Sequence, residues 1–131
     1  MKKHLAVIPL ILILVVALAA CASFTKTSYV TLHTSGDVYA TAMQVVADLQ
    51  GQGYIDQEKR NEINQVAKIY KEAHNAAVAA LEIYVITKAA PDKDKLTMAL
   101  IEVSVRWLDV AKLINAIKPG LVPMTLGGGA L

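Results

Sequence analysis

Residues 96–117 read LTMALIEVSVRWLDVAKLINAI, and they carry the most regular apolar period in the chain. The apolar residues recur in alternating steps of four and three, the spacing of a helix that packs along one face. They are Leu96, Leu100, Val103, Trp107, Val110, Ile114 and Ile117. On the opposite side Glu102 precedes Arg106 by one turn, the order that favours an ion pair. The stretch therefore predicts an amphipathic helix with one buried seam, which ends at Pro119 and Gly120.

A second amphipathic helix is predicted from about residue 57 to about residue 88. Asp56 is a good N-cap, and Pro91 disfavours helix in the residue before it. Small alanine side chains in the middle of the seam would let a neighbouring helix approach closely, with tyrosines at the ends of the contact. The predicted seam consists of Ile63, Val66, Tyr70, Ala73, Ala77, Ala80 and Tyr84.

The first helix of the domain is predicted to start near residues 35–37 and to end at Gly51, with Ser35 or Thr34 as its N-cap. Residues 21–34 are rich in hydroxyl and β-branched side chains and show no helical stripe, so we expect an extended tether there. Short connections between amphipathic helices predict an all-α, antiparallel three-helix bundle over residues 35–118. Residues 119–131, with three consecutive glycines from residue 127, are expected to form a flexible tail.

The N-terminus has the order of a secretory signal. A short cationic opening, residues 1–4, precedes an apolar run from Leu5 to Ala20 that ends in small residues. A membrane-spanning helix needs about 20 apolar residues, and Pro9 shortens the uninterrupted part of this run. We therefore expect residues 1–20 to be a signal peptide that is removed.

The end of this run, Leu18-Ala19-Ala20-Cys21, resembles the lipobox of bacterial lipoproteins, in which an aliphatic residue and two small residues precede an obligatory cysteine. The resemblance implies cleavage before Cys21, a diacylglyceryl group on its thiol, and acylation of its amine, with palmitate among the expected groups. No Asp follows Cys21, which in a Gram-negative host resembles the pattern of lipoproteins at the periplasmic face of the outer membrane. The alternative is an uncleaved N-terminal anchor in which Cys21 is an ordinary thiol.

Without the signal the remaining chain is electrically balanced. Lys2 and Lys3 belong to the signal, so the other Lys and Arg residues equal the 11 Asp and Glu in number. A neutral domain argues against nucleic-acid binding, which needs clustered cations on one face. Cys21 is the only cysteine, so no disulfide forms within the chain.

Catalytic and metal-binding patterns are weak, and we expect no enzyme, no cofactor and no metal site. His33, Ser35 and Asp37 are the residue types of a hydrolase triad, but a helix start explains them better. His74 has no second histidine one turn away, as a helical zinc site would require.

These features predict a lipid-anchored envelope protein whose helices act as a non-enzymatic protein-binding or structural module, with a protein partner or a second copy of the chain. The alternative is a small-ligand or cell-wall-binding module that uses an interhelical pocket near Tyr70, Tyr84 and Trp107. Apolar residues outside the main seams either widen the core or form an interface. They are Ile69, Ala76, Ile83, Ile101, Val105 and Leu108.

Overall fold

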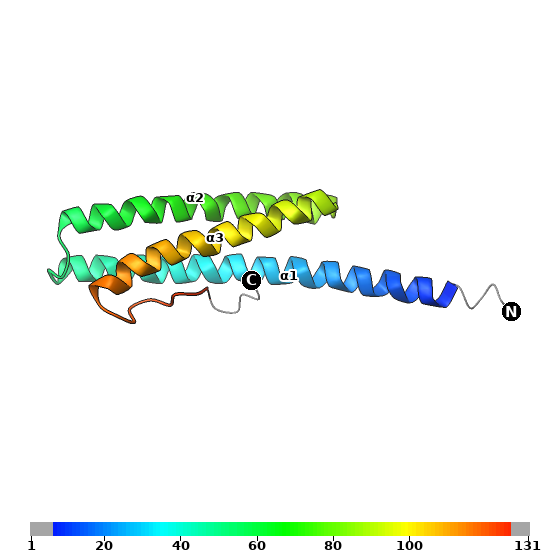
Figure 1. The fold of residues 1–131 in the computed structure, drawn as a ribbon, viewed down its shortest axis with the longest axis horizontal. Helices are drawn as coiled ribbons and strands as arrows, with labels where there is room; N and C mark the ends of the chain where they lie inside the picture. The colour runs from blue at the N-terminus through cyan, green and yellow to red at the C-terminus, as the bar shows by residue number, and fades with distance from the viewer. Residues whose placement is uncertain (1–6, 127–131) are drawn as a thin grey trace.

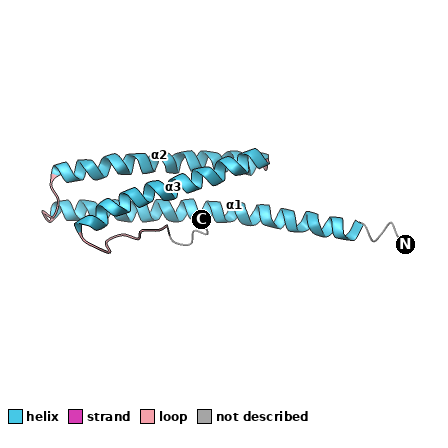
Figure 2. Cartoon of the chain, in the orientation of Figure 1, coloured by secondary structure: helices cyan, strands magenta, loops and turns pink. Residues whose placement is uncertain are grey.

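Three long helices form the described chain, and each runs antiparallel to the next (Figures 1 and 2). The structure is a computed structural model that describes residues 7–126, with side chains from residue 23 onward. The helices are α1 (Val7–Gly51), α2 (Gln57–Thr87) and α3 (Ala90–Ile117). The described residues contain no strand, so the predicted all-α three-helix bundle is confirmed.

The α2–α3 hairpin is the best-packed part of the bundle. The Asp56 carboxylate accepts a hydrogen bond from the Lys59 backbone N–H at 2.8 Å, as expected of an N-cap. α2 ends at Lys88, which has a left-handed backbone with φ 53°. Six of the seven residues in the predicted α3 seam are buried, and Ile117 is half-buried.

The first helix starts far earlier than the sequence predicts. The expected extended tether over residues 21–34 is wrong, because α1 runs without interruption from Val7 to Gly51. The hydroxyl groups that argued against a helix are satisfied inside it. Ser28 Oγ donates to Phe24 O at 2.8 Å, and Ser35 Oγ donates to Leu32 O at 2.9 Å.

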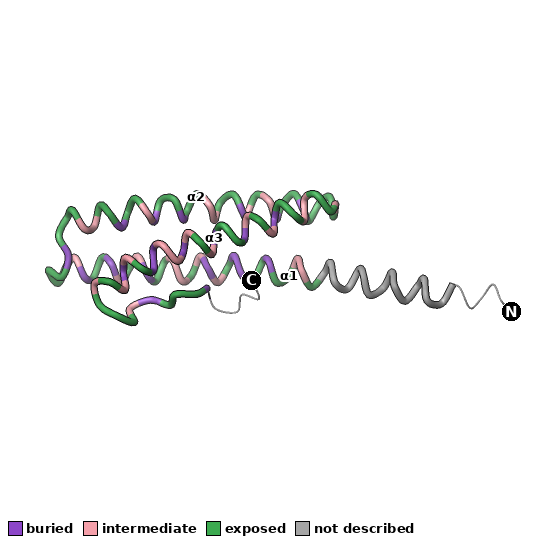
Figure 3. The backbone as a smooth tube through the Cα atoms, viewed as in Figure 1, coloured by how far each residue is buried: buried purple, intermediate pink, exposed green. Residues whose placement is uncertain are grey.

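These hydroxyl residues also form a buried stripe on α1. Ser28, Thr31, Leu32 and Ser35 are all buried, at the spacing of one helix face. The face continues through Ala42, Val46 and Leu49, so the first helix belongs to the core. α1 packs mainly on α2 and only slightly on α3. Buried residues recur along the part of α1 that lies in the bundle (Figure 3).

The segment after α3 closes the side that α1 and α3 leave open. The flexible tail predicted for residues 119–131 is wrong for residues 121–126, which turn back along the bundle and bury Val122 and Leu126 (Figure 1). The Asn115 side chain holds this segment, because its amide nitrogen donates to Val122 O at 2.9 Å and its amide oxygen accepts from Val122 N at 3.0 Å. Residues 127–131 lie outside the described residues.

Among residues 23–126, whose side chains are described, no helix is both long enough and apolar enough to cross a membrane. The apolar run from Leu5 to Ala20 lies outside the residues whose side chains are described.

Candidate functional site

Tyr70 lies at the centre of the core and not on a surface. It is buried, and its hydroxyl donates to Ser35 O on α1 at 3.0 Å. Its ring stacks on Tyr39 at a centroid distance of 5.0 Å and meets Trp107 edge-on at 5.7 Å. Burial raises the pKa of the Tyr70 phenol above its ordinary value of 10.0. This side chain joins all three helices.

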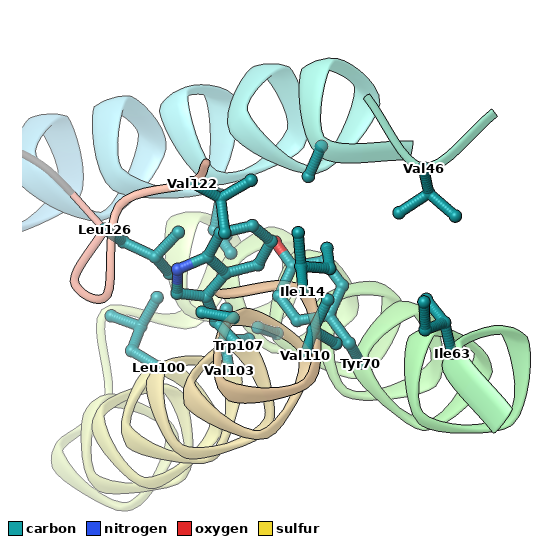
Figure 4. Close-up of a cluster of buried hydrophobic side chains, with 14 of the residues drawn as sticks. Val46, Ile63, Tyr70, Leu100, Val103, Trp107, Val110, Ile114, Val122 and Leu126 are labelled. Atoms are coloured by element: carbon teal, nitrogen blue, oxygen red, sulfur yellow. The ribbon is translucent and has the colours of Figure 1, made fainter. Parts of the chain in front are cut away.

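Trp107 is completely buried beneath the C-terminal segment. Figure 4 shows its indole between α3 and the segment that carries Val122 and Leu126. The indole N–H donates to Pro123 O at 2.9 Å. Because the returning segment both covers the ring and accepts its hydrogen bond, Trp107 is not available to a ligand.

Tyr84 is also buried, at the end of the bundle where α1 passes the α2–α3 turn. Phe24 of α1 meets its ring edge-on at 5.6 Å, and the Lys88 ammonium lies 5.2 Å from its ring centroid. The prediction that Tyr70, Tyr84 and Trp107 form a ligand or partner surface is therefore wrong. Their apolar rings fill the interior because each lies on a core-facing seam.

The hollows on the described surface lie elsewhere. One is lined by Tyr54, Lys59 and Ala116 at the end of the bundle near the α1–α2 loop. Another lies between α1 and the returning segment, beside Val38 and Leu121. None of the described hollows is lined by Tyr70, Tyr84 or Trp107, so the alternative pocket has no site at these residues.

The apolar residues outside the seams are mostly exposed. On α3, Met98 is 70% exposed, Ile101 51% and Val105 46%. These three residues share one helix face, and we call them the outer α3 surface. Leu108, one turn further along the same face, is half-buried. On α2, Ile69, Ala76 and Ile83 are also exposed, so these residues do not widen the core.

The histidines have structural surroundings. His74 Nε2 lies 2.9 Å from Leu32 O, and it must donate because a carbonyl oxygen only accepts. His33 and Asp37 form an exposed pair at 3.3 Å, whereas Ser35 between them is buried on another face of α1. Among residues with described side chains, no group of three or more His, Cys, Asp and Glu residues could hold a metal ion.

The four residues that resemble a lipobox belong to the α1 backbone, and their side chains lie outside the described ones. They are Leu18, Ala19, Ala20 and Cys21. The sequence did not indicate which residues contact this end of α1. Lys88 Nζ donates to Thr25 Oγ1 at 3.3 Å, and Lys93 Nζ lies 4.9 Å from the Phe24 ring centroid. The available signal was the four-residue spacing of Phe24, Ser28 and Leu32, which the polar neighbours of these residues obscured.

Comparison of the chain with protein-family models, with curated proteins and with solved structures finds no match in any of the three.

Proposed function

We propose that this chain is a bacterial envelope lipoprotein, anchored through acyl groups on Cys21, whose helical bundle binds a protein partner or a second copy of itself. The bundle acts by binding and not by catalysis. Confinement of one partner to a membrane raises its local concentration for the other. The observation that carries the binding role is the exposed outer α3 surface on a bundle whose core is already filled.

The anchor is supported by the order of residues at the N-terminus. A cationic opening, an apolar run and Leu18-Ala19-Ala20-Cys21 occur in sequence, and the chain has no other cysteine. One acyl chain binds a membrane only marginally, whereas two or three release very slowly, because each buried CH₂ contributes roughly 0.8 kcal/mol. On this proposal the chain is extracytoplasmic, at the periplasmic face of the outer membrane in a Gram-negative host.

The anchor is tested by Cys21→Ala and by inhibition of the type II signal peptidase with globomycin. We expect the wild-type protein to fractionate with membranes and to have the mass of an acylated chain that begins at Cys21. Cys21→Ala should abolish acylation, and globomycin should cause the uncleaved form to accumulate. Unchanged mass and membrane retention under both treatments would reject the anchor.

The partner role is supported by the chemistry of the outer α3 surface. Burial of apolar area yields about 25 cal/mol per Å², so Met98, Ile101 and Val105 leave binding free energy unused in the isolated bundle. Arg106 beside them is held by Glu102 at 2.6 Å and by Asp109 at 3.6 Å. An apolar face bordered by a fixed ion-pair cluster resembles the centre and rim of a protein interface.

This role is tested by crosslinking in intact envelopes, comparing wild type with the double variant Ile101→Glu/Val105→Glu. The matched control is Asn75→Glu/Ala79→Glu, which adds the same charge to an exposed face of α2. We expect a crosslinked product that the α3 variant loses and the α2 control retains. Its mass and composition distinguish a second copy from another protein. Equal crosslinking in all three proteins would reject the outer α3 surface as the interface.

A further inference from the structure

The end of the bundle nearest the N-terminus combines parts of all three helices. We call it the bundle tip, and it consists of residues 23–30 of α1 and residues 85–95 of the α2–α3 turn. Figure 1 shows α1 passing this turn and continuing beyond it. The contacts of Lys88 with Thr25 and of Lys93 with Phe24 fix the turn against α1.

The tip lies close to the proposed anchor. Thr25 follows Cys21 by four residues in one continuous helix, which at 1.5 Å per residue is an axial distance of about 6 Å. A lipid on Cys21 would enter the bilayer at the headgroup region. No extended linker separates the anchor from the bundle, so the tip must lie at the membrane surface.

The charges at the tip suit an anionic surface. The residues that form it contain four lysines and only two carboxylates. The lysines are Lys26, Lys88, Lys93 and Lys95, and the carboxylates are Asp92 and Asp94. Asp92 accepts a hydrogen bond from the Thr87 hydroxyl at 2.7 Å, and none of the four lysines forms an ion pair with a described carboxylate. Each lysine near an anionic leaflet contributes about 1 kcal/mol of attraction. At the opposite end, residues 48–62 and Lys118 carry four carboxylates and three cations.

The tip also presents an apolar side chain beside its lysines. Ile86 is 84% exposed, more than any other large apolar residue with a described side chain. An exposed aliphatic side chain among cations is typical of proteins that insert into the headgroup region of a bilayer. A lysine occupies position 88, although the left-handed backbone conformation there favours glycine.

We infer that the bundle tip is a second membrane contact, which binds anionic phospholipid headgroups through its lysines and inserts Ile86 at the interface. The inference rests on the proposed anchor at Cys21. It assigns the orientation of the anchored bundle, which stands on its tip with the α1–α2 loop away from the membrane.

The test uses the acylated protein that begins at Cys21 and carries one introduced thiol. Because the lipid occupies the Cys21 thiol, Ile86→Cys provides a single site for an environment-sensitive fluorophore. The matched control is Tyr54→Cys, since Tyr54 is 68% exposed at the opposite end. Each protein is reconstituted in vesicles of phosphatidylglycerol and phosphatidylethanolamine that contain a lipid-borne quencher. We expect strong quenching and a blue shift for the label at position 86 and neither for the label at position 54.

A charge series tests the headgroup contact. In the Ile86→Cys background, Lys26→Gln/Lys95→Gln removes two exposed tip lysines that form no hydrogen bond or ion pair with the described residues of the bundle, and it should lower the quenching at least twofold. Lys68→Gln/Lys71→Gln, on the exposed face of α2, should not lower it. The difference should vanish in vesicles of phosphatidylcholine alone. Equal quenching in both double variants would overturn binding of anionic headgroups.

Flotation of the same vesicles separates the two proposals. Protein that floats while position 86 remains unquenched has its anchor but no tip contact, which overturns this inference alone. Protein that floats with positions 54 and 86 equally quenched lies flat on the bilayer, which also overturns it. Protein that does not float refutes the anchor and this inference together.

Discussion

The Tyr70 hydroxyl is a polar group buried among apolar rings, and its hydrogen bond to Ser35 O links α2 to α1. Tyr70→Phe keeps the ring contacts and removes this bond. We expect a loss of about 1 kcal/mol in the free energy of unfolding, measured by urea denaturation. Tyr29→Phe is the control, because Tyr29 is 62% exposed and should tolerate the change. An equal effect of both substitutions would contradict the role of this bond.

Burial of Tyr70 also predicts how stability depends on alkaline pH. The pKa of its phenol is raised in the folded protein, so the folded state favours the neutral form. The resulting stabilisation is fully present below the ordinary tyrosine pKa of 10.0 and is lost as pH rises through the higher pKa of the folded state. Unfolding free energies measured across this range should fall more steeply in wild type than in Tyr70→Phe. Parallel curves would show that Tyr70 does not titrate differently on folding.

At the scale of single elements, regular apolar spacing predicted α2 and α3 well. Their seams contain aliphatic and aromatic residues whose burial follows from spacing alone. The same approach failed for α1, because Ser28, Thr31 and Ser35 are buried although their side chains are polar. The hydroxyls of Ser28 and Ser35 donate to backbone carbonyl oxygens within the helix. Polarity by itself gave the wrong answer for residues 23–34.

The C-terminal segment could not be predicted for a different reason. Its order depends on partners distant in sequence, namely the Trp107 indole N–H and the Asn115 amide. A sequence shows that a buried indole needs an acceptor, but it does not show that Pro123 supplies one. The same limit explains why Tyr70 and Tyr84 were wrongly predicted to line a ligand or partner surface. Aromatic residues on a helix have the same spacing whether they line a pocket or fill a core.

Gly36 is a testable weak point within α1. A Cβ at this position would meet His74 Nε2 at 3.8 Å, an ordinary contact. Gly36→Ala should therefore stabilise the bundle by about 0.5–1 kcal/mol, because glycine loses more conformational freedom in a helix than alanine. Gly53→Ala is the comparison, since Gly53 has φ +79° and a side chain there should destabilise. Thermal and urea unfolding should move in opposite directions for the two variants.

The Asn115 side chain holds residues 121–126, the segment that covers Trp107. Asn115→Ala removes both hydrogen bonds to Val122 and should cost about 1–3 kcal/mol of stability. Trp107 is the only tryptophan, so its fluorescence reports directly on the returning segment. We expect a red shift and greater quenching by acrylamide in the folded variant. Asn75→Ala on exposed α2 should change neither, and an unchanged Asn115→Ala spectrum would contradict the covering role.

At the scale of the whole molecule, the sequence predicted the architecture, while the anchor and its location remain predictions. The sequence left two interpretations of the apolar breadth of α3, a wider core or an interface. The exposure of Ile101 and Val105 excludes a core role for these two residues, and the interface stays a prediction. Spacing alone could not decide this, because the position of α1 and of the C-terminal segment determines which flank of α3 is covered.

The continuity of α1, together with the proposed anchor at Cys21, fixes how far each part of the bundle would lie from the membrane. From Cys21 to Gly51 the helix rises about 45 Å, so the α1–α2 loop would stand that far above the headgroups. The outer α3 surface begins eight residues after α3 starts at the tip, which places it roughly 10–25 Å above the bilayer. Because α1 is continuous, the proposed anchor would leave no flexible linker that lets the bundle reach partners farther from the membrane. On this arrangement we expect a partner to present its complementary face within that distance of the bilayer, as a membrane-bound protein or a neighbouring copy would.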